Sequence, residues 1–336
     1  MNLLRKIFFP FAILYGLITS IRNFLFDKGI LKSTSFDIPV IAVGNLSVGG
    51  TGKTPQIEYL IRLLSDNYRV ATLSRGYKRK SEGFVLADVT SNAEILGDEP
   101  FQFYQKFPNI QVAVDANRTN GISQLLSQKI KPEIILLDDA YQHRKVKAGF
   151  YILLTAFDDL YADDFMLPTG NLRESRSGAN RANIVVVTKC PKNLSDEEQN
   201  KIREKLKLNC SQQIYFTFID YDDAIYNKEN KIAVTEIKSE PKVLLAGIAK
   251  PKPFFDFLKN EKDECLTFPD HHHFTETDLN EIQHKAQGKK IITTEKDFVR
   301  LKDSDLVSRL YYLPIKSTFI NHQQNFNASI LEYVKS

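Results

Sequence analysis

The segment from residue 38 to residue 55 constrains the fold of this chain more than any other. An apolar run, IPVIAV, leads into the glycine-rich sequence GNLSVGGTGKTP, and a helix-like stretch follows from Thr54 to Ser65. Glycines let the backbone bend sharply and approach a phosphate group closely. The N–H groups at the start of the following helix then face an anion. The order of strand, loop and helix therefore predicts a phosphate-binding loop.

The loop is expected to hold a nucleoside triphosphate, ATP with Mg²⁺. Lys53 can reach the β- and γ-phosphates, and the hydroxyl of Thr54 can hold the metal. The usual pattern has glycine at position 47, where this chain has serine, but the other glycines suffice. The residues predicted to bind the nucleotide are Ser47, Val48, Gly49, Gly50, Thr51, Gly52, Lys53 and Thr54.

Two adjacent carboxylates, Asp138 and Asp139, follow the apolar run IILL. In a doubly wound sheet, ligands bind at the carboxyl ends of the strands, so these side chains are predicted to hold or orient Mg²⁺. A pair of aspartates alone would more commonly mark a turn.

A second strand, NIVVV, tests whether the nucleotide is GTP. It ends in Thr188-Lys189-Cys190-Pro191, with proline where a guanine-binding motif carries aspartate. This difference weighs against GTP.

Strand-like and helix-like runs alternate along the chain, which is typical of a mostly parallel sheet covered on both faces. We predict an α/β fold: a P-loop NTPase-like, doubly wound sheet and a second, smaller α/β domain, joined by a β-stranded linker. The first series of expected strands is Pro39–Val43, Arg69–Leu73, Gln111–Val114, Ile134–Leu137, Tyr151–Leu154 and Asn183–Thr188, and its helices are Thr54–Ser65, Phe101–Phe107 and Arg118–Gln128. A polar helix with a capping-box start at Ser195 follows.

The second series follows two β-rich runs, Gln213–Asp220 and Lys231–Ile237, which indicate a hairpin or a two-stranded linker. Its expected elements are strand Lys242–Ala246, helix Pro253–Leu258, strand Glu264–Phe268, helix Glu276–Ala286, strands Lys290–Thr294 and Leu310–Pro314, and helix Asn327–Tyr333. The predicted domains are therefore an N-terminal segment 1–32, a P-loop domain 33–212, a linker 213–238 and a C-terminal domain 239–336.

The N-terminal segment is apolar from Ile7 to Thr19, interrupted by Pro10 and flanked by basic residues. This run is shorter than the roughly 18–20 residues that span a bilayer, and no small-x-small cleavage site of a signal peptide follows it. Ile21, Phe24 and Leu25 extend the apolar stripe at helical spacing. We predict a helix in the membrane interface, with its basic residues near anionic headgroups. The alternative is a helix packed on the protein's own core.

The overall charge gives no support for a nucleic-acid partner. The 336 residues include 45 Lys and Arg and 41 Asp and Glu, a net charge of +4. Nucleic-acid binding usually needs a strongly basic face, so no nucleic-acid partner is expected. The sequence indicates no obligate protein partner either.

These motifs, in this order, resemble those of the tetraacyldisaccharide 4′-kinases, the lipid A 4′-kinases of Gram-negative bacteria. The resemblance covers nearly the whole chain and rests on the apolar N-terminus, VGNLSVGGTGKTP (43–55), LSRGYKR (73–79), GDEP (97–100), DDAYQHR (138–144), LPTGNLRE (167–174), VVVTK (185–189), FPDHHHF (268–274) and TTEKDFVRL (293–301). One departure is Ala140, where the family's DDGFQHR has glycine. It should cost little if the backbone there is not left-handed.

The resemblance implies ATP-dependent phosphorylation of the 4′-hydroxyl of a tetraacylated glucosamine disaccharide 1-phosphate, which gives lipid IVA. It also implies a peripheral or monotopic enzyme on the cytoplasmic face of the inner membrane. The N-terminal helix would then hold the active site at the bilayer surface, where the acyl chains of the acceptor lie.

The resemblance also assigns roles to residues. Asp98 is the expected base and His271 its partner, beside Lys53 at the transferred phosphate. Glu99 joins the metal candidates Thr54, Asp138 and Asp139. The acceptor is expected to contact Arg75, Arg118, Gln142, Arg173 and Glu174, the last as a metal or hydroxyl ligand. Because Asp98 and His271 lie in different predicted domains, domain closure would assemble the site.

Simpler interpretations stay open for several of these residues. Asp98 could be only a helix N-cap, and Arg75 and Arg118 could merely pair with acids. His143 could be a structural histidine. The run from His271 to His273 suggests zinc, but consecutive residues do not face one metal ion.

Two other functions also fit the sequence. One is a membrane-associated P-loop ATPase that drives assembly or trafficking without phosphorylating a metabolite. The other is a kinase of a soluble small molecule.

Overall fold

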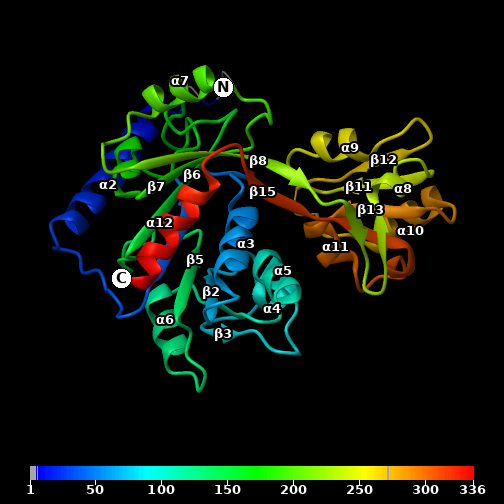
Figure 1. Cartoon of the computed structure of the whole chain (residues 1–336), viewed down its shortest axis with the longest axis horizontal. Coiled ribbons are helices and arrows are strands. Elements are labelled where there is room, and N and C mark those ends of the chain that lie inside the picture. Colours follow the sequence, from blue (N-terminus) through cyan, green and yellow to red (C-terminus); the bar gives the residue numbers. More distant parts are fainter. Residues whose placement is uncertain (1–4, 6, 271) are drawn as a thin grey trace.

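The computed structural model describes residue 5, residues 7–270 and residues 272–336. These residues form two α/β units side by side, each built on its own sheet (Figure 1). The prediction of a doubly wound, mostly parallel sheet with a smaller α/β partner is confirmed.

The larger sheet has nine strands among the described residues, in the order β15-β8-β7-β6-β1-β5-β2-β4-β3. Their bounds are β1 Val40–Asn45, β2 Val70–Ser74, β3 Val85–Leu86, β4 Gln111–Val114, β5 Ile134–Asp138, β6 Phe150–Ala156, β7 Ile184–Thr188, β8 Gln213–Tyr221 and β15 Ile315–Phe319. All neighbours pair in parallel except β3 with β4 and β15 with β8. Strands β2 to β5 lie on one side of β1, and strands β6 to β8, which come later in the chain, lie on the other side. The strand order therefore reverses at β1, and sheets of this kind bind ligands beyond the carboxyl end of the strand where that happens.

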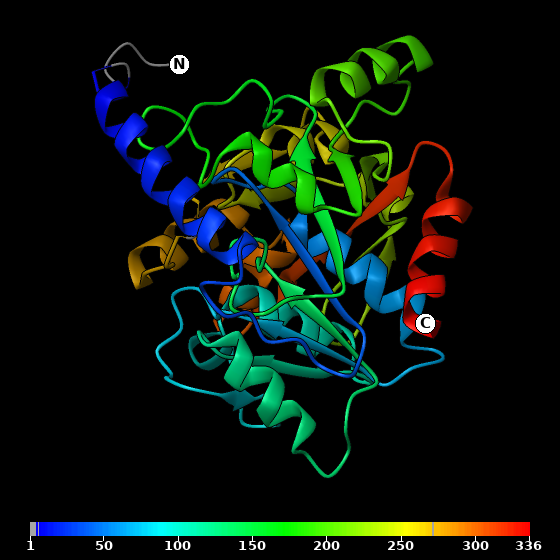
Figure 2. The same ribbon diagram turned by 90° about the vertical axis from the view of Figure 1, so that its left-hand side faces the viewer.

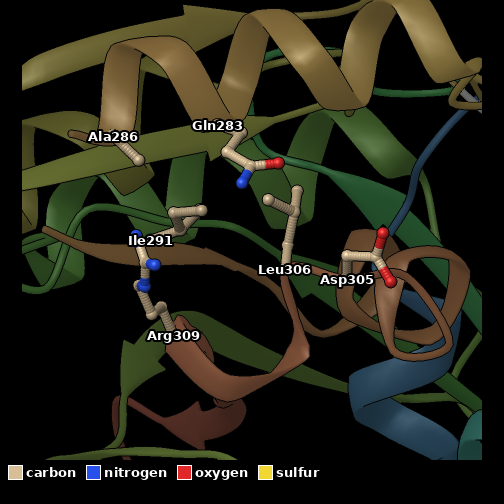
Figure 3. Close-up of a pocket in the computed structure, with 6 residues that line it drawn as sticks. All are labelled: Gln283, Ala286, Ile291, Asp305, Leu306 and Arg309. Atoms are coloured by element: carbon tan, nitrogen blue, oxygen red, sulfur yellow. The ribbon is translucent and has the colours of Figure 1, made fainter. Parts of the chain in front are cut away.

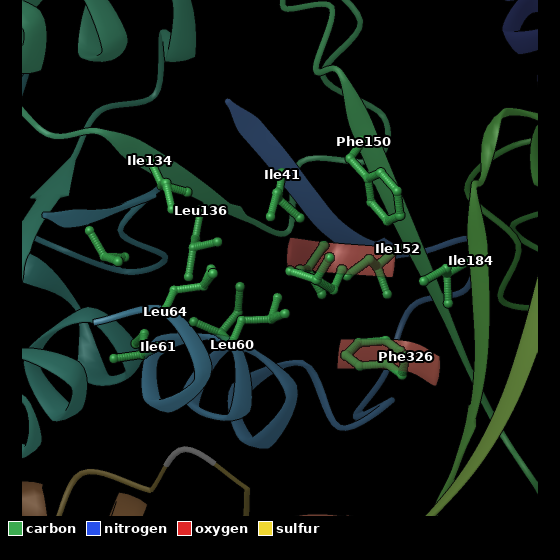
Figure 4. Packing of buried hydrophobic residues seen from close by; sticks show 14 of the residues in the cluster. Ile41, Leu60, Ile61, Leu64, Ile134, Leu136, Phe150, Ile152, Ile184 and Phe326 are labelled. Carbon is green, nitrogen blue, oxygen red and sulfur yellow. The ribbon is translucent and has the colours of Figure 1, made fainter. Parts of the chain in front are cut away.

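Helices cover both faces of this sheet because the side chains of each strand alternate between them. Ile41 of β1 faces α3 (Lys53–Leu64) and α12 (Gln323–Lys335) in the largest apolar cluster, shown in Figure 4. Ala42 faces α6 (Arg118–Leu126) on the opposite side. The remaining helices of this unit are α2 Phe9–Asp27, α4 Ala93–Leu96, α5 Asp98–Lys106 and α7 Asp196–Leu206. The predicted capping box at Ser195 is confirmed.

The smaller sheet has six strands among the described residues, in the order β10-β9-β14-β13-β11-β12. Its elements are β9 Ala224–Tyr226, β10 Lys231–Ala233, α8 Val234–Ile237, β11 Lys242–Ala246, α9 Lys252–Leu258, β12 Glu264–Thr267, α10 Glu276–Ala286, β13 Lys290–Thr294, α11 Glu295–Leu301 and β14 Leu310–Leu313. One apolar cluster includes α9 and the other includes α10 and α11, so both faces are covered.

The predicted domain limits need two corrections. The runs at 213–220 and 231–237 do not form a hairpin, because β8 pairs with β7 and β15 while β10 pairs with β9. The last strand and helix do not belong to the smaller unit. Pro314 separates β14 from β15, which returns to the larger sheet, and α12 follows it there through Phe326. The two crossings between the units, β8 and β15, lie next to each other (Figure 1).

Helix α2 lies along the outside of the larger unit (Figure 2). The hydroxyl of Tyr15 donates to the carbonyl of Arg173, and Arg144 pairs with Asp27 at 2.7 Å. The side chains exposed on α2 include Phe11, Leu14, Leu17, Ile18, Ile21 and Phe24. Within the described chain, α2 is the one helix long and apolar enough to cross a membrane, judged by length and composition alone. Only 17% of its most apolar stretch is buried, yet Asn23 and Asp27 bond to Glu174 and Arg144 of the larger unit. The helix therefore packs on the larger unit along one side and exposes apolar side chains along the other.

Candidate active site

The glycine-rich loop, residues 46–52, joins β1 to α3. Gly52 caps α3 with φ of +81°, a left-handed conformation that favours glycine. The loop is supported from β7: Thr188 Oγ1 donates to the carbonyl of Thr51 at 2.8 Å, and Lys189 Nζ donates to that of Gly50 at 2.5 Å. The N–H groups in the first turn of α3 have no partners within the helix, so the loop can bind an anion.

Lys53 is held beside two side chains at the ends of neighbouring strands. Its Nζ lies 3.6 Å from Asp139 Oδ1 and 3.5 Å from Asn45 Oδ1. Arg173 donates to both oxygens of Asp139, at 3.1 and 2.8 Å, and also contacts the side chain of Asn45. Burial acts to raise the pKa of Asp139, but Lys53 and Arg173 outweigh it and lower that pKa to about 2. Asp139 is therefore a fixed anion that orients Lys53 and Arg173.

Asp138 stands in a different environment from its neighbour. Burial, followed by the charge of Asp139, raises the pKa of Asp138 to about 6, and Lys53 opposes the rise. Its side chain accepts a hydrogen bond from Ser74 Oγ at 3.3 Å. A buried carboxylate with such a raised pKa gains most from a bound cation. Asp139 has a left-handed φ of +46° and Ala140 does not, so the alanine departure fits the fold.

Arg118 does not reach the space beside the loop. Its side chain is 2% exposed and donates to the carbonyls of Asp115 and Asp138, at 2.5 and 3.1 Å. It therefore fixes the backbone at Asp138, and its predicted contact with the acceptor is wrong for this conformation. Arg75, at the end of β2, is exposed and stays an acceptor candidate.

Glu174 is also structural. It is fully buried, and its carboxylate accepts hydrogen bonds from Asn23, Gln142 and Arg181 at 2.6, 2.9 and 2.8 Å. The prediction that it contacts a metal or a substrate hydroxyl is therefore wrong. The bond from Asn23 instead fastens α2 to the loop that carries Arg173. Gln142 also donates to the carbonyl of Asn45 at 2.8 Å, so it supports the end of β1.

Asp98 and Glu99 begin α5 and face the smaller unit. The helix cap is Gly97, so the interpretation of Asp98 as N-cap is wrong. Arg300 of α11 donates to Asp98 Oδ2 from Nη2 at 2.6 Å and from Nε at 3.0 Å. Lys296 of the same helix pairs with Glu99 at 2.7 Å. The two carboxylates therefore lie where the units meet. Glu99 also contributes to the raised pKa of Asp138, which places it near that carboxylate.

The histidines considered in the sequence analysis are His143 and the run from His271 to His273. His271 lies outside the described residues. His272 pairs with Asp278 at 3.0 Å. His143 is half-buried, and burial, together with the charges of Arg118 and Lys145, lowers its pKa to about 4. Among the described residues, no group of three His, Cys, Asp or Glu side chains could hold a metal by itself.

Two pockets lie away from the loop. One, of about 20 Å³, lies in the smaller unit beside Gln283, Leu306 and Arg309 (Figure 3), and it has room for little more than one water molecule. The other is an open pocket of about 300 Å³ between the end of α2 and the start of α6. Its lining residues are Phe26, Leu31, Lys32, Thr34, Asn117, Thr119 and Lys145.

Several residues of the site escaped the sequence analysis. Asn45 is fully buried at the end of β1, and a buried amide directly before a glycine-rich loop indicates a supporting contact. Lys296 and Arg300 lie on α11, which was not predicted as a helix. Its start carries a signal that could have revealed it, because Thr294 accepts a hydrogen bond from the N–H of Asp297 in a capping arrangement.

Comparisons with known proteins agree with this geometry. The profile of the Tetraacyldisaccharide-1-P 4′-kinase family matches residues 4–335. Curated relatives named tetraacyldisaccharide 4′-kinase include one from Flavobacterium johnsoniae, 84% identical over 100% of this chain and 98% of its own. Another, from Bacteroides thetaiotaomicron, is 46% identical over 99% of this chain and 94% of its own. The structure is similar to the crystal structure of LpxK from Aquifex aeolicus in complex with ATP. That comparison has a TM-score of 0.79 and 30% identity, and it covers 99% of this chain and 100% of the other.

Proposed function

The chain belongs to the tetraacyldisaccharide-1-P 4′-kinase family, and on that basis we propose that it transfers the γ-phosphate of ATP to the 4′-hydroxyl of a tetraacyldisaccharide 1-phosphate in lipid A biosynthesis. One observation carries the proposal more than any other. Lys53 at the start of α3, Asp138 at the end of β5 with Asp139 directly after it, and Asp98 and Glu99 at the start of α5 all belong to strand ends or helix starts of one unit.

The residues around the loop fit ATP with Mg²⁺. The loop and the first turn of α3 offer backbone N–H groups to an anion, and Lys53 is already oriented by Asp139. The hydroxyl of Thr54 and the carboxylate of Asp138 would hold Mg²⁺, which usually takes few protein ligands and completes its shell with phosphates and water. When bound, the ion supplies positive charge to the phosphate oxygens. Lys53 and Arg173 add positive charge on the protein's side.

Transfer requires a base for the acceptor hydroxyl, and Asp98 is the proposed one. Its carboxylate would take the hydroxyl proton as that oxygen forms a bond to the γ-phosphorus and ADP leaves. His271 is proposed to assist Asp98, as the family resemblance implies. Because Asp98 meets the smaller unit through Arg300, movement of that unit would change access to the base.

The acceptor is proposed to approach along α2. Its exposed Phe11, Leu14 and Leu17 would enter the membrane interface on the cytoplasmic face of the inner membrane. The open pocket at the end of α2 carries Lys32 and Lys145, whose charges suit the phosphate of an anionic lipid. The exposed Arg75 is proposed to bind that acceptor as well.

Transfer of label from γ-labelled ATP to purified tetraacyldisaccharide 1-phosphate in detergent micelles tests the proposal. We expect label in the lipid, little ATP hydrolysis without acceptor, and loss of transfer in Asp98→Ala with retained ATP affinity. Arg309→Ala, at an exposed position of the smaller unit, is the matched control. Label released only as free phosphate would favour the rival function of a membrane-associated ATPase and refute ours. A soluble acceptor phosphorylated equally well after deletion of residues 1–26 would also refute it.

A further inference from the structure

The segment TTEKDFVRL, which the site chemistry does not use, forms the contact between the smaller unit and the proposed base. It spans the end of β13 and all of α11. Each turn of α11 brings a charged side chain to the larger unit. Glu295 meets Lys106 at 2.5 Å, Lys296 meets Glu99 at 2.7 Å, and Arg300 meets Asp98 at 2.6 Å.

Arg300 is held more firmly than a surface arginine. Its side chain is 8% exposed, and its Nη1 donates to Asp297 Oδ1 at 3.2 Å. Asp297 is fully buried and accepts hydrogen bonds from the N–H of Gly247, at 2.9 Å, and from Thr294 Oγ1, at 2.7 Å. A Cβ at position 247 would lie 2.9 Å from Asp297 Oδ1, so only glycine fits this contact without a shift. A continuous set of bonds therefore links the core of the smaller unit to Asp98.

The geometry at Asp98 is specific. Both nitrogen contacts of Arg300 fall on the same oxygen, Oδ2, so they fix the rotation of the carboxylate. Val299 on the same helix packs in an apolar cluster with Leu96 and Phe101 of the larger unit. That packing sets the position of α11. Because Arg300 lies on α11, the position of the helix determines where Arg300 holds the carboxylate of Asp98. A misplaced general base loses much of its rate advantage, since catalysis requires a defined approach to the hydroxyl.

We infer that Arg300 is a positioning residue, which orients the carboxylate of Asp98 for proton transfer and couples it to the smaller unit through Asp297. The inference rests on the proposed function, because it assigns Asp98 as the base. In this assignment Arg300 acts through Asp98, with which it shares two hydrogen bonds. Its removal should therefore matter only while Asp98 is present.

The test is a double-mutant cycle in the lipid-labelling assay, with kcat and KM measured separately. Arg300→Ala should lower kcat about a hundredfold, an effect typical of a misplaced catalytic group, while the KM for ATP changes less than about threefold. In the Asp98→Ala background the same substitution should not lower the residual kcat, measured at high enzyme concentration, any further. Added guanidinium ion should partly restore kcat in Arg300→Ala, a response that a general loosening of the fold would not give.

Lys302→Ala is the matched control, since Lys302 also crosses to the larger unit, over the ring of Phe101 at 4.0 Å, without contacting Asp98. It should keep kcat near that of the wild type. If Arg300→Ala does not fold, Arg300→Lys replaces it in the same comparison. It should lower kcat when Asp98 is present and leave the residual kcat unchanged in the Asp98→Ala background. Equal losses in both backgrounds, or an unchanged kcat, would overturn the inference. Wild-type protein that labels no lipid would instead overturn the proposed function.

Discussion

A buried cluster of one lysine and two carboxylates joins the two units, and removing the lysine tests its contribution. Lys106 Nζ lies 2.7 Å from Glu58 Oε2 and 2.5 Å from Glu295 Oε1. The side chains of Glu58 and Glu295 are only 1% and 7% exposed. Burial and the charge of Glu58 raise the pKa of Glu295, and Lys106 opposes the rise. Lys106 therefore neutralises charge that water cannot reach.

Lys106→Met should affect the two carboxylates unequally. Glu58 keeps Arg62, at 2.8 Å, and Gln102, at 2.9 Å, whereas Glu295 keeps the N–H of Ile315 at 3.2 Å. Removing one partner of a buried ion pair costs about 3–5 kcal/mol. Because Glu58 stays paired, we expect the lower end, about 3 kcal/mol, which corresponds to a fall of about 6–12 °C in the unfolding temperature of a domain of this size.

The loss should depend on pH. The folded-state pKa of Glu295 lies above its unfolded value, so the folded protein binds more protons between the two values and its stability falls as pH rises through that interval. Without Lys106 this pKa rises further. The destabilisation should therefore be greatest near pH 8 and smaller near pH 5, where Glu295 is protonated. Glu295→Gln, added to Lys106→Met, should recover much of the loss at pH 8.

Urea unfolding at pH 8 and pH 5.5, followed by circular dichroism, measures these differences. Lys201→Met is the control, because Lys201 and its partner Glu197 are 69% and 77% exposed and their pairing should contribute little. A loss below about 1 kcal/mol at pH 8, or equal losses at both pH values, would refute the assignment of Lys106 as the charge that stabilises this contact.

Three further predictions follow from the site and from α2. Because the pKa of Asp138 is raised to about 6, the affinity for magnesium–ATP, measured by calorimetry, should weaken as pH falls below about 6, and Asp138→Asn should reduce this dependence to the part that comes from titration of the nucleotide's own phosphate. Glu174→Leu leaves Arg181 without its buried partner and should cost about 3 kcal/mol in urea unfolding; a neutral effect would contradict the structural role. Replacing Phe11, Leu14 and Leu17 together by serine should weaken flotation with anionic vesicles about a hundredfold at an unchanged unfolding temperature, and undiminished binding would remove α2 from the membrane contact.

Most of the fold could be predicted because its elements carry strong local signals. The buried strands are continuous apolar runs, and the limits of β4, β11, β13 and α10 agree with those expected from sequence. The errors arose where a local signal was weak or misleading. Pro314 ends a predicted strand but stands between two strands that belong to different sheets. Nothing local to residues 315–319 shows that they pair with β8, since that pairing joins residues nearly a hundred positions apart.

The site was predictable in part, for a similar reason. The loop geometry follows from glycines and one lysine that are adjacent in sequence. Which charged side chains face the ligand depends on burial, which spacing does not reveal. Glu174 and Arg118 share motifs with site residues, yet both are buried and support the backbone. The contact between Arg300 and Asp98 depends on the packing of α11 against α5, which the sequence alone does not indicate.

The most direct test of the account compares wild type with Lys53→Ala in a single turnover with γ-labelled ATP, Mg²⁺ and the tetraacylated disaccharide 1-phosphate. The account predicts label on the lipid for the wild type and a loss of about a thousandfold or more for Lys53→Ala, because the lysine is required where charge develops on the transferred phosphate. Equal labelling by both proteins would contradict it.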